Sequence, residues 1–288
     1  MTWWISGLLN GRMPELPEVE TVVRELRAHG LEHAVIHDVN ISWPRMVMGQ
    51  TPARFAVALR GRTILRVTRR GKYIVIVLNS GQHLLIHLRM TGKFRFAKTI
   101  ETPGTHDHVV FSLSDGRRLF FNDTRKFGRL RLASAAEDGL GDLGPEPLDN
   151  AFTSQVLRAR MKGKTRMIKP LLLDQTCVAG LGNIYVDESL WQAKIHPQRR
   201  ADSLTASETR KLHQAIREVL QRAVENCGTT LGAGETNFYG ITGRSGHNAD
   251  SLKVFRRTGK ACPRCGNIIV RTVIGQRGTH LCPSCQIP

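Results

Sequence analysis

The chain has 288 residues, 41% of them hydrophobic, which is enough for two domains with apolar cores and a small appendage. Its 42 lysines and arginines outnumber 24 aspartates and glutamates, so the formal net charge is +18. This excess favours an acidic partner, nucleic acid ahead of an anionic membrane. No apolar run approaches the ~20 residues of a spanning helix. The cysteine pattern shows no disulfide framework, which fits a cytoplasmic protein.

Residues 1–12 contain a short apolar stretch, Trp3–Leu9. It is too short for an export signal, no basic residues precede it, and no small-residue cleavage site follows it. We expect this extension to lie outside the fold. From Pro17 a helix is predicted, because proline suits a first turn and the next apolar residues form one stripe as far as Gly30.

Residues 34–132 are predicted to form strands. Ile74–Leu78 is a buried apolar run, and two further strands, His108–Leu113 and Arg118–Phe121, flank a Ser-Asp-Gly turn. A helix followed by many antiparallel strands predicts an α+β protein with several domains. Its first domain, residues 13–138, is expected to be an antiparallel β-sandwich.

A second, helical domain is predicted over residues 151–250. A hinge rich in glycine and proline precedes it, over residues 139–150. Thr205 and Glu208 form a capping box that opens a long amphipathic helix. Residues 228–250 are rich in glycine, threonine, serine and asparagine, which predicts a mobile functional loop.

Two C-x-x-C pairs close the chain, within a module predicted over residues 251–288. They are Cys262 with Cys265 and Cys282 with Cys285, with sixteen residues between the pairs. Redox dithiols or disulfides are the alternative, but two matched pairs at this spacing favour one tetrahedral Zn²⁺. Four thiolates leave no open coordination position, so we expect a structural metal rather than a catalytic one.

Ordered motifs run through the chain from Met13. The first reads Met-Pro-Glu-Leu-Pro-Glu-Val-Glu-Thr. The others are Arg-Arg-Gly-Lys-Tyr (69–73), His-Leu-Arg-Met-Thr-Gly (87–92), His-Asp-His (106–108), Asn-Asp-Thr-Arg-Lys-Phe-Gly (122–128), Leu-Gly-Pro-Glu-Pro-Leu (143–148), Ile-Lys-Pro-Leu-Leu-Leu-Asp-Gln (168–175), Gly-Leu-Gly-Asn-Ile-Tyr (180–185) and Gly-Thr-Thr-Leu (228–231). Together with the cysteine module, this pattern over residues 13–286 resembles the formamidopyrimidine-DNA glycosylase family, bacterial enzymes that excise oxidised purines such as 8-oxoguanine.

The resemblance implies an architecture and a set of partners. The helical domain would be a helix-two-turn-helix domain with a lesion-capping loop, and the cysteine module a zinc finger with one structural Zn²⁺. The partner would be damaged double-stranded DNA. The protein is expected to act as a monomer, to cut the glycosidic bond and to nick the abasic site by β,δ-elimination through a Schiff base.

The implied nucleophile is Pro14, because the family uses a proline that follows the initiator methionine. An N-terminal secondary amine has a pKa near neutrality, unlike lysine at ~10.4. Glu15 would protonate the opening sugar and shuttle protons during elimination. If the chain starts at Met1, Pro14 carries an amide and cannot attack. Either translation starts later, or the extension is removed, or the protein is catalytically inactive; we expect initiation at Met13 followed by removal of that methionine.

Lys72 and Arg277 complete the implied catalytic set. Lys72 matches a lysine that contacts phosphate beside the lesion, and Arg277 matches the zinc-finger arginine that grips phosphates around the flipped nucleotide. The other implied phosphate contacts are His106, one of Lys164, Thr165 and Arg166, and Asn183 at a helix start, where backbone N–H groups bind anions. Glu18 and Glu188 are similar to family glutamates near the active centre.

Three further residues match side chains that family members insert into the duplex, namely Met90, Arg125 and Phe127. An apolar wedge and an arginine can fill the gap left by a flipped nucleotide, which offsets a few kcal/mol of unstacking. Without the resemblance, Met90 and Phe127 would be assigned to core packing and Arg125 to a surface charge.

Two alternatives remain open from the sequence. The first is the sister endonuclease VIII type, which acts on oxidised pyrimidines; Leu16 favours the purine branch, since the sister enzymes usually carry glycine there. The second is a DNA-binding homologue that has the same scaffold but a blocked N-terminus and no catalysis.

Overall fold

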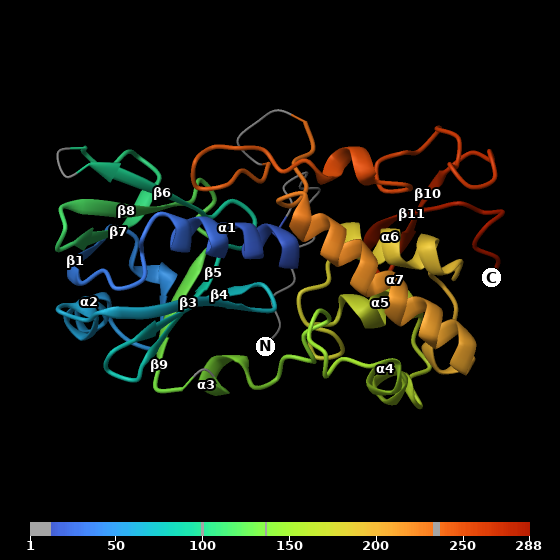
Figure 1. Ribbon diagram of the computed structural model, residues 1–288, viewed down its shortest axis with the longest axis horizontal. Helices are drawn as coiled ribbons and strands as arrows, with labels where there is room; N and C mark the ends of the chain where they lie inside the picture. Colours follow the sequence, from blue (N-terminus) through green and yellow to red (C-terminus); the bar gives the residue numbers. More distant parts are fainter. Residues whose placement is uncertain (1–12, 99–100, 136, 233–236) are drawn as a thin grey trace.

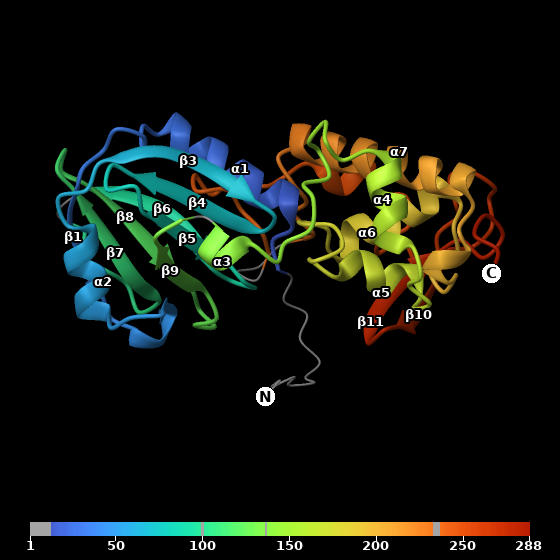
Figure 2. The same ribbon diagram turned by 90° about the horizontal axis from the view of Figure 1, so that it is seen from below.

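The computed structural model describes residues 13–98, 101–135, 137–232 and 237–288. The predicted extension, residues 1–12, lies outside the described residues. Two lobes lie side by side, one built of sheets and one of helices (Figures 1 and 2). Helix α1 (Leu16–Ala28) begins at their junction and runs along the sheet lobe, where it contacts β3, and it also contacts α7. Within the described ranges, no helix has the length and apolar character needed to cross a membrane.

The sheet lobe is the predicted sandwich, with both sheets contributing to one apolar core. The four-stranded sheet has the order β1 (Ile36–Ile41), β7 (Asp107–Leu113), β8 (Arg117–Asn122) and β6 (Lys93–Lys98). The five-stranded sheet has the order β2 (Val47–Met48), β9 (Arg129–Ala133), β5 (His83–His87), β4 (Tyr73–Leu78) and β3 (Ile64–Arg70). All pairs are antiparallel except the two-residue β2, which pairs parallel with β9.

One helix lies where strands were predicted, so that part of the prediction is wrong. Helix α2 (Pro52–Leu59) begins after Thr51, whose hydroxyl oxygen accepts a hydrogen bond from the Arg54 backbone N–H at 3.3 Å. A threonine cap followed by proline is a local helix start. Phe55 and Leu59, four residues apart, then bury one face against the sandwich core.

The second lobe is helical, as predicted. Its helices are α4 (Ser154–Met161), α5 (Ile168–Leu173), α6 (Asn183–Ala193) and α7 (Ala206–Glu225). Helix α3 (Glu137–Leu140), which precedes them, packs against β9 of the sheet lobe (Figure 2). The predicted capping box is present: Thr205 Oγ1 accepts from the Glu208 backbone N–H at 3.2 Å, and Glu208 Oε2 accepts from the Thr205 N–H at 2.8 Å. Short 3₁₀ turns cover Pro44–Met46, Ala201–Ser203 and Asn248–Ser251, and the hairpin β10 (Val270–Ile274) and β11 (Arg277–Leu281) follows near the C-terminus.

The segment predicted as a hinge is held firmly to the sheet lobe. Glu146 accepts hydrogen bonds from Arg69 Nη1 at 2.7 Å and Arg70 Nη1 at 3.0 Å. Arg70 also donates to the carbonyls of Leu143 and Gly144. Because these partners sit at the end of β3, the clamp fixes the β3–β4 turn against the linker.

The described parts of the loop over residues 228–250 are anchored. The Ile241 backbone N–H donates to Glu25 of α1, and Thr230 Oγ1 donates to the Phe238 carbonyl at 2.6 Å. The His247 N–H donates to the Asn226 carbonyl at 2.8 Å. These bonds tie the loop to the ends of both α1 and α7, so it closes over the junction of the lobes.

Candidate active site and nucleic-acid interface

Glu15 joins the two lobes at the centre of the molecule. It is 5% exposed and immediately precedes α1. Its carboxylate accepts hydrogen bonds from the backbone N–H groups of Ile184 at 3.0 Å and Tyr185 at 3.4 Å, in the first turn of α6. A Cβ added at Gly182 would lie 2.2 Å from Glu15 Cδ, so only glycine fits the N-cap of α6. The helix N-terminus provides free donors and positive potential for this acid.

Glu18 supports Glu15 from one turn further along α1. Glu18 accepts from the Glu15 backbone N–H at 2.9 Å and from the Thr229 N–H at 2.7 Å, and the hydroxyl of Tyr185 also donates to it. Burial raises the pKa of Glu18. The sequence analysis left the role of this residue open; the structure makes it the brace that connects α1, α6 and the loop after α7.

Burial and nearby charges together bring the pKa of Glu15 close to neutral pH. Burial is the main cause that raises the pKa of Glu15 from 4.5 to about 7; the positive charge of Lys72 opposes this shift and the negative charge of Glu18 adds to it. Burial also lowers the pKa of Lys72, a shift that Glu15 opposes and Arg277 reinforces. Carboxyl, amine and guanidinium therefore share one electrostatic environment, as expected of a site for proton transfer.

Pro14 lies directly beside this group and is buried. It lines a small cavity together with Met13, Glu18, Ile184, Thr229, Leu231, Asn237 and Phe238. The cavity thus lies between the start of α1, the start of α6 and the loop after α7. In the sequence as printed, Met13 acylates the Pro14 nitrogen, which therefore has no lone pair available for attack.

Arg277 is exposed at the first position of β11, across the two-residue turn from Ile274. The hairpin that carries it is fixed to α5 and α6 by buried groups. Lys169, fully buried, donates to Asp187 Oδ1 at 2.6 Å and to the Gly278 carbonyl at 3.1 Å. Asn183 Nδ2 donates to the same carbonyl at 2.9 Å.

The sequence analysis missed Lys169 and Asp187, although both lie in or beside motifs quoted above. The only available signal was a lysine inside the apolar run Ile-Lys-Pro-Leu-Leu. Asp187 Oδ2 also accepts from the His280 backbone N–H at 2.9 Å, so one carboxylate holds both α5 and β11. A buried pair of this kind costs several kcal/mol if one partner is removed, because the other charge is left uncompensated.

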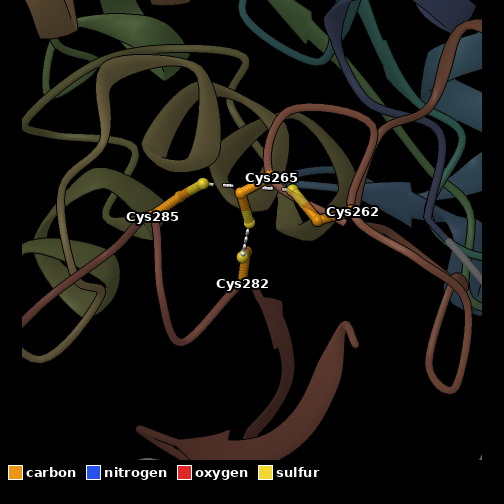
Figure 3. Close-up of side chains that lie close together, drawn as sticks. All are labelled: Cys262, Cys265, Cys282 and Cys285. Carbon is orange, nitrogen blue, oxygen red and sulfur yellow. Dashed lines mark hydrogen bonds between the residues drawn. The ribbon is translucent and has the colours of Figure 1, made fainter. Parts of the chain in front are cut away.

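The four C-terminal cysteines converge on one point (Figure 3). All four Sγ atoms lie within 4.8 Å of one another; Cys262 and Cys285 are 4.0 Å apart, and Cys265 and Cys282 are 3.4 Å apart. Thiolates around a tetrahedral zinc with bonds of about 2.3 Å would lie about 3.8 Å apart, so the cluster fits one structural Zn²⁺. Trp191 Nε1 donates to Cys262 Sγ at 3.4 Å, which orients this sulfur as outer-shell donors do.

The three predicted insertion residues meet on two adjacent loops of the sheet lobe. Arg125 Nη1 lies 3.3 Å from Met90 Sδ, and the guanidinium carbon lies 4.8 Å from the ring centroid of Phe127. Phe127 is 43% exposed. An exposed phenylalanine beside a cation and a thioether is unlike core packing, the alternative assignment made from sequence.

The remaining residues predicted to contact DNA differ in whether their side chains are exposed or already bonded within the protein. His106, Lys164 and Thr165 are exposed. Arg166 is engaged by Asp174 at 3.0 Å and by the Pro170 carbonyl, which favours Lys164 or Thr165 as the contact. Glu188 is placed away from the site: its carboxylate accepts from the backbone N–H groups of residues 253–255 and so caps that segment.

Comparison with known proteins places this arrangement in a family. The model of the formamidopyrimidine-DNA glycosylase N-terminal domain matches residues 13–130, and that of the H2TH domain of the same family matches residues 143–233. The zinc finger found in FPG and IleRS matches residues 259–287. The chain belongs to the formamidopyrimidine-DNA glycosylase family.

Relatives of known name agree with this assignment. The chain is 44% identical over 275 residues to the formamidopyrimidine-DNA glycosylase of Protochlamydia amoebophila, an alignment that covers 95% of this chain and 99% of the relative. The enzyme of Herpetosiphon aurantiacus is 45% identical over 276 residues, covering 95% and 100%. A solved complex of a Lactococcus lactis FPG mutant with a Fapy-dG containing DNA superposes with a TM-score of 0.88 at 38% identity, covering 96% of this chain and 100% of that one.

The pKa of Glu15 predicts a pH-dependent stability. Because the folded protein holds a proton at Glu15 that the unfolded chain releases, stability from this group is complete below pH 4.5 and is lost as the pH rises through about 7. A shift of this size corresponds to about 3 kcal/mol. Glu15→Gln cannot ionise, so its melting temperature should fall less between pH 4.5 and pH 8 in calorimetry. The exposed control Glu225→Gln should follow the unchanged protein; parallel curves for all three would disprove the buried acid.

Removal of one zinc ligand should disable DNA binding without unfolding the sheet lobe. We expect Cys282→Ser to release the metal and disorder the hairpin that carries Arg277, because the zinc–thiolate bonds would hold the two C-x-x-C turns together and the hairpin runs between them. Zinc content by mass spectrometry and duplex affinity should both fall. Cys227→Ser, which replaces an exposed thiol outside the cluster, is the matched control. Normal binding by a zinc-free Cys282→Ser protein would contradict the assignment.

Proposed function

We propose that this protein excises oxidised purines from duplex DNA and then cleaves the strand at the abasic site. The observation that carries the proposal is the buried Glu15 carboxylate, which directly follows Pro14 and has a pKa of about 7. The charge of Lys72 acts on Glu15, and that of Arg277 acts on Lys72. Solved relatives from Lactococcus lactis in complex with Fapy-dG DNA and with abasic-site DNA support it. We further propose that it acts as a monomer on the bacterial nucleoid.

The chemistry begins at Pro14 once residues 1–13 are absent. The secondary amine attacks C1′ of the damaged nucleotide, the C1′–N9 bond breaks, and the base leaves with the bonding electrons and takes up the proton that the Pro14 nitrogen gives up. Glu15, which retains a proton near neutral pH, donates it to the ring oxygen as the sugar opens. The product is an iminium between C1′ and the Pro14 nitrogen.

The iminium then accepts electrons from the sugar. Loss of a proton from C2′ expels the 3′ phosphate, and a second elimination expels the 5′ phosphate and leaves a one-nucleotide gap. Glu15, now a carboxylate, can take up a proton in these steps. Lys72 and Arg277 would hold the two phosphates and stabilise the developing negative charge.

The wider surface would hold the duplex. His106, Lys164 and Asn183 are proposed to contact phosphates, which together with the net charge of +18 predicts binding that weakens steeply with salt. Met90, Arg125 and Phe127 would enter the helix where the nucleotide leaves the stack. Such insertion offsets a few kcal/mol of unstacking and kinks the duplex at the site.

Two forms of the chain test this proposal directly. A chain beginning at Pro14 should release 8-oxoguanine opposite cytosine in single-turnover assays at least about 10 times faster than it releases thymine glycol, since pocket shape decides which base is accepted. A chain that keeps residues 1–13 should bind the same duplex with similar affinity and leave the base in place, because the Pro14 nitrogen is then acylated.

Each outcome separates one alternative. Faster release of thymine glycol would indicate the oxidised-pyrimidine specificity of the sister enzymes. Binding without excision by both forms would indicate a DNA-binding homologue without catalysis. Equal excision by both forms would remove Pro14 from the mechanism.

A further inference from the structure

Two loops of the sheet lobe carry all three proposed insertion residues. We define the methionine loop as residues 89–92, between β5 and β6, and the arginine loop as residues 123–128, between β8 and β9. More than thirty residues separate them in the chain, yet Arg125 of one lies 3.3 Å from the sulfur of Met90 in the other. Both loops cross from one sheet to the other, and the pairing of β5 with β9 and of β6 with β8 brings their ends side by side. Contacts within the loops must then set the positions of the three side chains.

The side chain of Thr91 links the two loops. Its hydroxyl donates to Asp123 Oδ1 and accepts from the Arg125 backbone N–H at 3.3 Å. Thr91 is 3% exposed, so solvent does not compete for these bonds. One hydroxyl of the methionine loop therefore contacts both the first residue of the arginine loop and the residue that bears its guanidinium.

Asp123 closes the arginine loop from the other side. It is fully buried, and the same Oδ1 accepts from the Arg125 N–H at 3.1 Å. Its Oδ2 accepts from the Gly128 N–H at 2.6 Å, so one carboxylate spans the loop from its start to its end. A Cβ at Gly128 would lie 2.6 Å from the Phe121 ring and 3.1 Å from Asp123 Oδ2. Only glycine therefore lets the backbone come this close to Phe121 and Asp123.

The methionine loop is fixed at its other residues as well. His87 Nδ1 accepts from the Arg89 N–H at 2.9 Å. Arg89 has a φ of 55°, in the left-handed region. Burial, together with the nearby Arg89 and Lys72 charges, lowers the pKa of His87 to about 3, so this acceptor stays unprotonated at neutral pH. The Gly92 N–H returns to the Leu88 carbonyl at 3.0 Å. The loop thus has one defined shape, and Thr91 sets its position against the arginine loop.

We propose that the Thr91–Asp123 clasp is a positioning device that assembles Met90, Arg125 and Phe127 into one wedge before DNA arrives. Thr91 and Asp123 are positioning residues: they act through the three side chains that enter the duplex. Holding the wedge in advance removes the entropy cost of ordering two loops during nucleotide flipping. This inference rests on the insertion role proposed above.

Thr91→Val tests the clasp with little change in volume, since it replaces the hydroxyl by a methyl group. Thr91→Ser, which keeps the hydroxyl, is the matched control. The readout is the fluorescence rise of 2-aminopurine placed beside 8-oxoguanine, which reports loss of stacking, followed by single-turnover excision. We expect Thr91→Val to slow both steps about 10- to 100-fold, as misplacement by about 1 Å can do. Thr91→Ser should stay within about twofold of the unchanged chain, and affinity for undamaged duplex should not change for either.

A double-mutant cycle distinguishes positioning from general loss of stability. In an Arg125→Ala background, Thr91→Val should slow base opening by a smaller factor than it does when Arg125 is present, because one of the three side chains that it positions is already gone. Full additivity of the two losses would assign Thr91 to fold stability and overturn the proposal, as would equal losses for valine and serine at Thr91. All variants are made in, and compared with, the chain that begins at Pro14. If that chain excises 8-oxoguanine and its Thr91→Val variant does so equally fast, the clasp alone is wrong; if that chain excises nothing, the proposed function fails instead.

Discussion

The buried carboxylate of Glu15 at the N-terminus of α6 is the contact on which the rest of the structure depends. It places the first residues of the sheet lobe against the first turn of a helix in the other lobe, at 3.0 Å and 3.4 Å from two backbone N–H groups. A helix N-terminus would ordinarily keep such an acid ionised. Here burial outweighs the helix and Lys72, so the pKa rises to about 7 and the group can give and take a proton at physiological pH.

Every other part of the site is positioned with respect to that contact. The clamp between Glu146 and two arginines fixes the β3–β4 turn that presents Lys72, while the buried pair Lys169–Asp187 fixes the hairpin that presents Arg277. Both anchors use charged side chains that are hydrogen-bonded and mostly withdrawn from solvent. Such networks add little to stability compared with an apolar core, but they specify one geometry. The site therefore lies between the lobes, with the two groups proposed to bind phosphate supplied from either side.

Local patterns in the sequence predicted the parts of the fold that local physics decides. The apolar runs predicted strands of the sandwich, Thr205 and Glu208 predicted the start of α7, and the spacing of Cys262 to Cys285 predicted the cysteine cluster.

The contacts that depend on tertiary approach could not be predicted in this way. Lys169 meets Asp187 across α5 and α6, and Thr91 meets Asp123 across two neighbouring loops. No distinctive sequence pattern surrounds these residues. Helix α2 was missed because strand-like patterns on both sides of it led to a prediction of strands throughout residues 34–132. The catalytic and DNA-contacting roles came only from the family resemblance, since a proline and a glutamate before a helix carry no chemical signal alone.

The central claim is that the nitrogen of Pro14 forms the covalent bond to DNA. It is tested most directly by borohydride reduction of a chain beginning at Pro14 in the presence of abasic-site duplex, followed by proteolysis and mass mapping of the peptide that carries the nucleotide. The account predicts that the adduct maps to Pro14 and that the same treatment of a chain retaining residues 1–13 gives no adduct. An adduct on Lys72, the nearest other amine in the electrostatic environment of Glu15, would contradict it.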